Sequence, residues 1–531
     1  MATTASIRLA ALTFISAAMC AAQVSPPPGM PASTAARILE QATWGPSATS
    51  IADLRSKGFE LWFQNQVTAP ISTYPNQPAN SIVNGKSVVN TDLTPVERQF
   101  FQNAVSKPDQ LRQRVAFALS EMWVVSQQSV VRSAAYFPPL LNIFQKDAFG
   151  SYQQLMADVT LNPAMGHYLD MLNNNKATAN SSPNENYARE LMQLFTLGLN
   201  NLNQDGTLAL DQNNNPIQTF TPATVSAMAA ALTGWTYAQT GMANFTIPMV
   251  PTEKNGAETQ HDMTEKFLPF IDPEGQTNTI TLPPGQTAEL DLAEALNAVY
   301  SQPSLAPFVV TQLIQHLVTS NPSPQYVLDV VNVFNNTNGN LQQVVYAILT
   351  DPEARAGDNG LDYDTLTFGH FREPALLLAN LLRGLNGTVS PTSTVYNFSA
   401  ALGQPLFQEP SVFSYFSPQY EIAEGVFGPE LQLHTTQTAV IRANDISSIV
   451  YKNVLDAGTT FDIAEFVSAA QSSTAALETA ISNRFFHGMM SGTLVTAINE
   501  ALRDPKTNTP TLEAEAALYL ALTSGEYQVI H

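Results

Sequence analysis

The chain has 531 residues, of which 44% are hydrophobic, so it is long enough to bury a sizeable core. Only 13% of its residues are charged, and 44 acidic residues against 23 basic ones give a formal net charge of −21. Nucleic acids and anionic membrane surfaces are bound through clusters of lysine and arginine, so this excess of acid argues against both as partners. The composition fits a soluble protein and does not indicate a particular fold.

The first 22 residues have the features of a secretory signal peptide. Arg8 supplies positive charge, residues 9–19 form a short apolar run, and small residues continue to Ala22. We expect cleavage after Ala22, which places the mature protein in the periplasm or outside the cell. The apolar run is too short to span a membrane, and no other apolar run in the sequence is long enough, so no transmembrane segment is expected.

The one cysteine, Cys20, lies inside this predicted signal. A lipid anchor on Cys20 is the alternative, but Met19 is larger than the small residue that usually precedes such a cysteine. Cleavage after the signal leaves a mature chain without cysteine. Such a chain has no disulfide, no catalytic thiolate and no cysteine-ligated metal.

Residues 23–32 are rich in proline and predict an extended, mobile linker. Residues 33–531 show mainly helical periodicity, without regular repeats, and predict a single large multi-helix domain with a small β-hairpin and long irregular loops. Early in this domain, residues 51–67 predict two short helices broken at Gly58.

A strongly periodic helix is predicted after Pro108, and it carries two cations near its start. Arg112 and Arg114 lie where the helix dipole does not favour positive charge. They either pair with acidic residues elsewhere in the chain or form a solvated face.

The most informative stretch covers residues 182–237. A helix is predicted to begin at Pro183 or Asn184, and a second helix begins after Thr221. The polar segment between them imitates half of a calcium loop, but it has too little charge for one, so a β-hairpin is expected there.

The start of the first of these helices concentrates charge. The i, i+4 spacing places Glu185 beside Arg189, and Asn186 beside Glu190. The arrangement is either an ion pair at a helix start or a carboxylate pair beside an arginine. The second alternative could bind a cation or act as a general acid and base.

Two long loops follow, at residues 240–286 and 388–429, and loops of this length are usually functional or disordered. The first contains His261-Asp262, which could ligate a metal or relay a proton, or could be a plain loop pair. A zinc site needs three or four ligands, and no HExxH, P-loop, dinucleotide or nucleophile-elbow motif occurs. His167 and His316, on apolar helices, are expected to be buried core histidines.

Several motifs together resemble the bacterial family described as domain of unknown function 1800, over residues from about 33 to the C-terminus. The motifs are ARILEQATWGP (36–46), LRQRVAFALSEMWVV (111–125), NPAMGHYLDMLNN (162–174), PNENYARELMQLFTLGL (183–199), QDGT (204–207), NPIQTFT (215–221), LTGWTY (232–237), HDMTEK (261–266) and LGQPLFQEPSVF (402–413).

This resemblance implies a secreted or envelope location, a mostly helical fold and an envelope partner that looks like an alkaline phosphatase or sulfatase. The family has no established activity, so it transfers no catalytic residue, metal or cofactor. After Phe413 the family usually continues with Gly-Trp-Pro, whereas this chain has Ser414-Tyr415-Phe416. A pocket shaped by that loop would therefore differ in this chain.

Two hypotheses remain, and the first is favoured because no complete catalytic motif is present. The protein is a secreted binding or assembly module that works with an envelope partner, or it is a hydrolase acting on an extracellular polymer or ester. The hydrolase would use Glu185 or Glu190 with His261 or Asp262, oriented by Arg189. Further binding residues would be Asn186, Tyr187, Trp235, Lys266, Gln404, Phe407 and Gln408. The hydrolase hypothesis requires three segments, residues 185–190, 261–266 and 403–408, to converge on one pocket.

Overall fold

The structure is a computed structural model that describes residues 23–127, 131–239, 245–358 and 367–531. Within these residues it contains 21 α-helices, and every sheet has only two strands, which confirms the mainly α prediction. The buried apolar residues form one continuous cluster from the first helix to the last strand. The predicted signal peptide lies outside the described residues.

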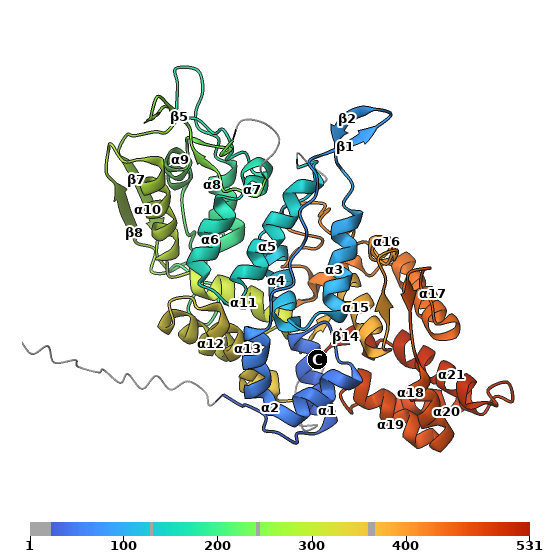
Figure 1. Ribbon diagram of the computed structural model, residues 1–531. Coiled ribbons are helices and arrows are strands. Elements are labelled where there is room, and N and C mark those ends of the chain that lie inside the picture. Colours follow the sequence, from blue (N-terminus) through green and yellow to red (C-terminus); the bar gives the residue numbers. More distant parts are fainter. Residues whose placement is uncertain (1–22, 128–130, 240–244, 359–366) are drawn as a thin grey trace, which may run out of the picture.

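The N-terminal third contains a kinked helix and a projecting hairpin (Figure 1). Its elements are α1 (Ala32–Ala42), α2 (Ala48–Thr68), β1 (Asn80–Val83), β2 (Lys86–Val89), α3 (Thr94–Ser106), α4 (Gln110–Met122), η1 (Ala134–Tyr136), α5 (Phe137–Asp147), α6 (Tyr152–Thr160) and α7 (Pro163–Tyr168). The predicted break in α2 is confirmed, because Gly58 has a φ of 75° inside it.

The middle of the chain packs a long hairpin and two helices against α9. Its elements are α8 (Asn186–Glu190), the π-helical η2 (Leu191–Thr196), α9 (Pro222–Ala231), β3 (Trp235–Thr236), β4 (Val250–Pro251), β5 (Glu253–Lys254), β6 (Ala257–Glu258), β7 (Lys266–Ile271), β8 (Thr277–Leu282), α10 (Ala288–Tyr300), α11 (Leu305–Leu317), α12 (Pro324–Asn336), α13 (Leu341–Thr350) and α14 (Pro352–Arg355). The predicted hairpin after α8 folds back through isolated bridges rather than continuous strands.

The C-terminal part contains the fully buried helix α15 and ends back at the core. Its elements are β9 (His370–Phe371), α15 (Pro374–Gly384), β10 (Thr388–Val389), α16 (Tyr396–Ala401), β11 (Glu421–Ala423), β12 (Val426–Phe427), η3 (Pro429–Leu433), α17 (Thr436–Lys452), β13 (Thr459–Thr460), α18 (Ala464–Ser472), α19 (Thr474–Phe485), α20 (Gly492–Leu502), α21 (Pro510–Thr523), η4 (Glu526–Gln528) and β14 (Val529–Ile530). The last strand, β14, pairs antiparallel with β9.

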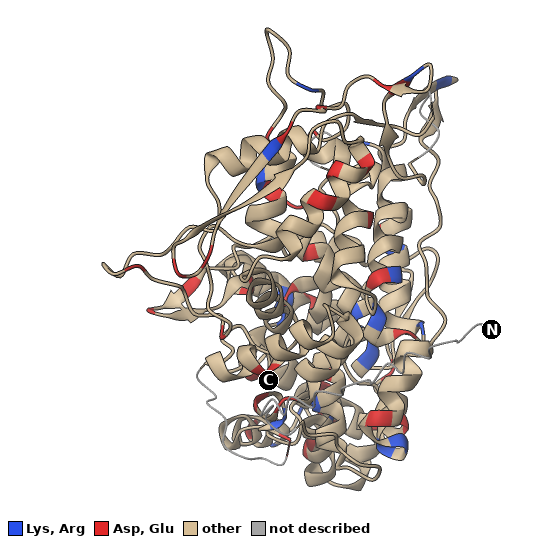
Figure 2. Ribbon diagram, turned by 90° about the vertical axis from the view of Figure 1, so that its left-hand side faces the viewer, with Lys and Arg blue, Asp and Glu red and all other residues tan. Residues whose placement is uncertain are grey.

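Figure 1 shows α4 and α11 near the middle, with α8–α10 on one side and α16–α21 on the other. No helix in the described ranges combines the length and the apolar character needed to cross a membrane. Figure 2 shows that acidic and basic positions lie along the packed helices as well as on peripheral loops.

The two arginines of α4, Arg112 and Arg114, are buried, which rules out the solvated face that was one of their two interpretations. Arg112 donates to the carbonyl oxygens of Gln145 and Val67. Arg114 is surrounded by acidic side chains, as the alternative interpretation required. Their shared helix therefore carries positive charge into the interior, where it needs compensation.

Candidate functional site

The predicted helix start at α8 forms an exposed ion pair. Arg189 Nη2 lies 3.0 Å from Glu185 Oε2, and the two side chains are 43% and 39% exposed. Ser226 of α9 also donates a hydrogen bond to Glu185. Exposed pairs of this kind contribute at most about 1 kcal/mol, so this geometry agrees with a simple ion-paired helix start.

The other predicted residues of α8 have separate environments. Tyr187 is buried, and its hydroxyl lies 2.6 Å from Thr160 Oγ1. The Asn186 side chain donates a long hydrogen bond to Asp170 Oδ2, at 3.4 Å, and its backbone nitrogen donates to Asn184 Oδ1 at 2.9 Å. Glu190, at the junction with the π-helix, is half-buried, and its Oε2 has no hydrogen-bond partner. Burial raises the pKa of Glu190, which makes it the one acid of this helix that departs from a simple surface role.

His261 is buried, and both of its ring nitrogens have partners. Nδ1 lies 3.0 Å from Thr233 O, and Nε2 lies 3.0 Å from Asp291 Oδ2. Lys266 Nζ lies 2.6 Å from the same Asp291 oxygen. Burial opposes ionisation of Asp291, but hydrogen bonds from His261, Lys266 and Gln286 keep its pKa below the usual value. This network joins the loop to α10 and leaves no free imidazole nitrogen.

The neighbouring predicted residues also have local partners. Asp262 Oδ1 accepts hydrogen bonds from the backbone nitrogen and the hydroxyl of Thr264, which is a turn typical of aspartate. Trp235 is buried, and its Nε1 has no partner. Within the described residues no group of three or more His, Cys, Asp or Glu side chains has the arrangement of a metal site.

Two of the three predicted segments are close together. Asn174 bridges them: its Nδ2 donates to Asn184 O, beside the start of α8, and its backbone oxygen accepts from Gly234 N. Gly234 in turn lies against His261, so close that a Cβ at Gly234 would lie 2.9 Å from the His261 backbone nitrogen. Residues 185–190 and 261–266 therefore border the same helix, α9.

The third segment, residues 403–408, lies elsewhere. Phe407 is buried against the rings of Phe100 and Phe137. Gln408 donates to Glu97 Oε1 at 3.3 Å. Gln404 is buried within a cluster of glutamates between α4 and α15. It contacts Glu121, which lines a cavity on its other side.

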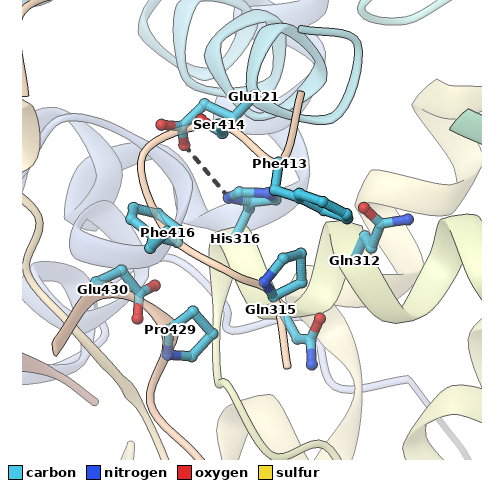
Figure 3. Close-up of a pocket in the computed structure, with 10 residues that line it drawn as sticks. Glu121, Gln312, Gln315, His316, Phe413, Ser414, Phe416, Pro429 and Glu430 are labelled. Carbon is cyan, nitrogen blue, oxygen red and sulfur yellow. Dashed lines mark ion pairs between the residues drawn. The ribbon is translucent and has the colours of Figure 1, made fainter. Parts of the chain in front are cut away.

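That cavity is formed by three distant parts of the chain and has a volume of about 30 Å³ (Figure 3). Helix α4 contributes one wall, α11 a second, and the segment from the long loop to η3 the third. The lining residues are Glu121, Gln312, Gln315, His316, Phe413, Ser414, Phe416, Pro418, Pro429 and Glu430. None of the sequence-predicted site residues is among them. However, the loop at 388–429, predicted to be functional or disordered, supplies five of them, from Phe413 to Pro429.

Three titratable groups line the cavity. His316 Nδ1 lies 3.5 Å from Glu121 Oε2, as the dashed line in Figure 3 marks. Glu430 Oε1 lies 3.1 Å from His370 Nδ1, behind the wall. Glu121 Oε2, Glu430 Oε2 and Ser414 Oγ are buried without hydrogen-bond partners. Buried polar atoms in a cavity wall that lack partners are a common feature of ligand sites.

A second layer of polar residues supports Glu121. Gln404 Nε2 donates to Glu121 Oε1 at 3.3 Å and also to Glu373 Oε2. Arg114 is fully buried beside Glu373 and Glu121, and it donates to the carbonyl oxygen of His316. This arrangement places one buried cation among several carboxyl groups and fixes α4 against α11.

Burial keeps the cavity groups uncharged near neutral pH. It raises the pKa of Glu430 to about 8, and it raises the pKa of Glu121 well above the usual value with help from the neighbouring Glu373. Burial, and then the charge of Arg114, lowers the pKa of His316 to about 3. Protonated carboxyl groups therefore face a neutral imidazole, which is a set of proton donors and a proton acceptor.

Comparison with known proteins agrees with the sequence resemblance. Residues 37–529 match the model of the family described as "Protein of unknown function (DUF1800)". The chain belongs to this DUF1800 family. No curated protein and no solved structure matches it. The DUF1800 description carries no activity, so only the geometry of this chain bears on its function.

One feature of the sequence points to this site, and it lies at the end of α4. Every residue of α4 from Gln110 to Leu119 is buried, and so is Glu121. An acidic residue between the apolar run Val115–Leu119 and the pair Met122-Trp123 indicates a buried carboxylate with a specific partner. His316 was expected to be a core histidine. It is largely buried, but it also forms part of the cavity wall.

Proposed function

We propose that this DUF1800 protein is a hydrolase whose acid–base site is the cavity between α4, α11 and η3. The observation that carries the proposal is the convergence of Glu121, His316 and Glu430 from three separate parts of the chain. Two of their carboxyl oxygens lack partners and line the same cavity. Strongly shifted titratable groups in a concave site are typical of catalytic centres.

The proposed reaction moves two protons. Water attacks the electrophilic carbon of the substrate and loses a proton to His316, whose neutral imidazole can accept it. The bond from that carbon to the leaving oxygen breaks, and protonated Glu430 donates its proton to that oxygen. The His316 imidazolium then releases its proton and the Glu430 carboxylate takes one up from solvent, which restores both groups. Glu121 positions His316 through their contact at 3.5 Å. Each such transfer contributes a rate factor of about 10² to 10⁴.

The location and partner expected from the sequence form part of this proposal. A protein secreted to the periplasm or beyond would meet polymers and esters outside the cell. An envelope protein that looks like an alkaline phosphatase or sulfatase would act beside it.

A second candidate, a binding module for that partner, is favoured by the β1–β2 hairpin. The hairpin projects from the body, and Ile82 and Val83 are 71% and 51% exposed on it (Figure 1). Exposed apolar side chains at a projecting strand pair are typical of docking sites. Capture of the partner by the wild-type protein but not by Ile82→Ser/Val83→Ser would support this candidate.

The hydrolase proposal is tested with the protein beginning at Gln23 and a panel of 4-nitrophenyl esters and glycosides. We expect turnover by the wild type and a loss of at least about 100-fold in kcat for Glu430→Gln. Glu185→Gln is the matched control, because that carboxylate is exposed and ion-paired. Absence of turnover across the panel, or an equal loss in Glu185→Gln, would contradict the proposal.

A further inference from the structure

The mouth of the cavity carries an unusual aromatic side chain. Phe413 is 47% exposed, and within the described residues the only other phenylalanine with a strongly exposed side chain is Phe267, at 53%, on β7. Phe413 is also the first residue of the loop to line the cavity, and its ring lies beside His316 and toward Gln312 (Figure 3). An exposed ring at a site entrance provides a flat apolar surface for a ligand.

The opposite wall of the mouth provides carboxamides. Gln312 and Gln315 lie three residues apart on α11, so their side chains are neighbours on one face of the helix. Gln315 Nε2 donates to Ser320 O at 3.1 Å, which fixes the amide and leaves its Oε1 to accept a hydrogen bond. Carboxamides of this kind recognise hydroxyl groups without requiring charge.

The charge of the cavity restricts the ligand further. No lysine or arginine lines it, so an anionic group would find no counterion there. Burial raises the pKa of both of its carboxyl groups, which disfavours the anionic form that a cation would need. The ligand that enters is therefore uncharged.

We infer that the substrate is a neutral polysaccharide, and that one pyranose ring stacks on Phe413 while its hydroxyl groups bind Gln312 and Gln315. This inference rests on the proposed function of the same cavity. A pyranose has an apolar face and a rim of hydroxyl groups, which match the ring and the amides. The cavity itself has a volume of only about 30 Å³, so the sugar ring lies at its mouth, against Phe413, rather than inside it.

An extended peptide fits these observations less well. Peptides are commonly held by main-chain hydrogen bonds to a sheet edge, and the residues that line this cavity belong to two helices, a loop and a 3-10 turn. A peptide ligand would therefore have to bind through side chains alone.

The experiment measures binding of maltohexaose, cellohexaose and chitohexaose by isothermal titration calorimetry. The proteins are the full chain from Gln23 as wild type, Phe413→Ala and the control Phe267→Ala. We expect at least one of the three oligosaccharides to bind, with a Kd raised 10-fold or more by Phe413→Ala and unchanged by Phe267→Ala. Both phenylalanines are half exposed, so both variants should fold, and thermal unfolding checks this.

The inference is overturned if none of the three neutral oligosaccharides binds, if Phe413→Ala binds as well as the wild type, or if only polygalacturonate or a casein-derived peptide binds. Glu430-dependent ester hydrolysis without glycan binding would refute this inference and support the proposed function. Glycan binding that depends on Phe413, without hydrolysis of any substrate, would support this inference and refute the proposed function.

Discussion

At the scale of single residues, burial rather than a special neighbour determines the chemistry of the cavity. Glu430 lies on the short 3-10 segment η3, with its side chain 6% exposed. Burial penalises the charged carboxylate and raises the pKa of Glu430 to about 8, and its partner His370 is itself kept neutral. A carboxylic acid that stays protonated at neutral pH can serve as a proton donor.

Activity should depend on this protonation state. As the pH rises through about 8, Glu430 loses the proton that it donates, so we expect kcat/KM to fall on the alkaline side with an apparent pKa near that value. A pH profile of kcat/KM measures it. Activity that persists unchanged to pH 10 would exclude Glu430 as the acid.

Glu430 also makes the stability of the fold depend on pH. Between the ordinary glutamate pKa and about 8 the folded protein binds a proton at Glu430 that the unfolded chain has released, so stability falls as the pH rises through this window. Glu430→Gln should therefore flatten the dependence of Tm on pH between about 5 and 8. An unchanged slope would show that Glu430 is not the group with the raised pKa.

At the scale of elements, Gly58 forms the kink that joins the two halves of α2. Gly58 has a φ of 75°, and a Cβ there would lie 2.8 Å from Pro28 N. The linker residue therefore packs directly on the kink, and Phe59 N donates to Pro26 O at 2.9 Å. The proline-rich segment, predicted to be extended, packs along this kinked helix.

Gly58→Ala should destabilise the fold through both the backbone conformation and the clash with Pro28. Gly85→Ala is the matched control, because Gly85 has the same φ of 75° but no atom within 4 Å of the added Cβ. We expect the free energy of unfolding to fall by about 1–2 kcal/mol in the control and by at least about 1 kcal/mol more in Gly58→Ala. Chemical denaturation measures both, and equal losses would show that the contact with Pro28 contributes nothing.

At the scale of the whole molecule, the C-terminus closes the core. Tyr527 is fully buried, and its hydroxyl donates to Asn380 Oδ1 at 2.7 Å. Its ring centroid lies 4.2 Å from the guanidinium carbon of Arg372, which pairs with the buried Glu40 of α1. The two ends of the chain are thus joined through one buried polar network.

Removal of residues 526–531 should expose this network and cost at least about 4 kcal/mol, because the Tyr527 ring is lost and Arg372 loses partners. Tyr527→Phe keeps the ring and should cost only about 1 kcal/mol. Thermal unfolding followed by circular dichroism compares the two. A truncated protein as stable as the wild type would show that the C-terminus does not close the core.

The sequence by itself determined the helices, the break at Gly58 and the family, because these depend on residues that are near one another in the chain. It also indicated that α4 carries cations in need of partners. The tertiary structure alone decided which acids meet Arg114, and that His261 is enclosed by Asp291 and Thr233. It also decided that Glu121, His316 and Glu430 share one cavity. The contacts of His261 span only 28 and 30 residues, but they too join separate elements. Glu121, His316 and Glu430 lie roughly 100 to 300 residues apart, and no local pattern encodes which buried faces of α4, α11 and η3 pack together.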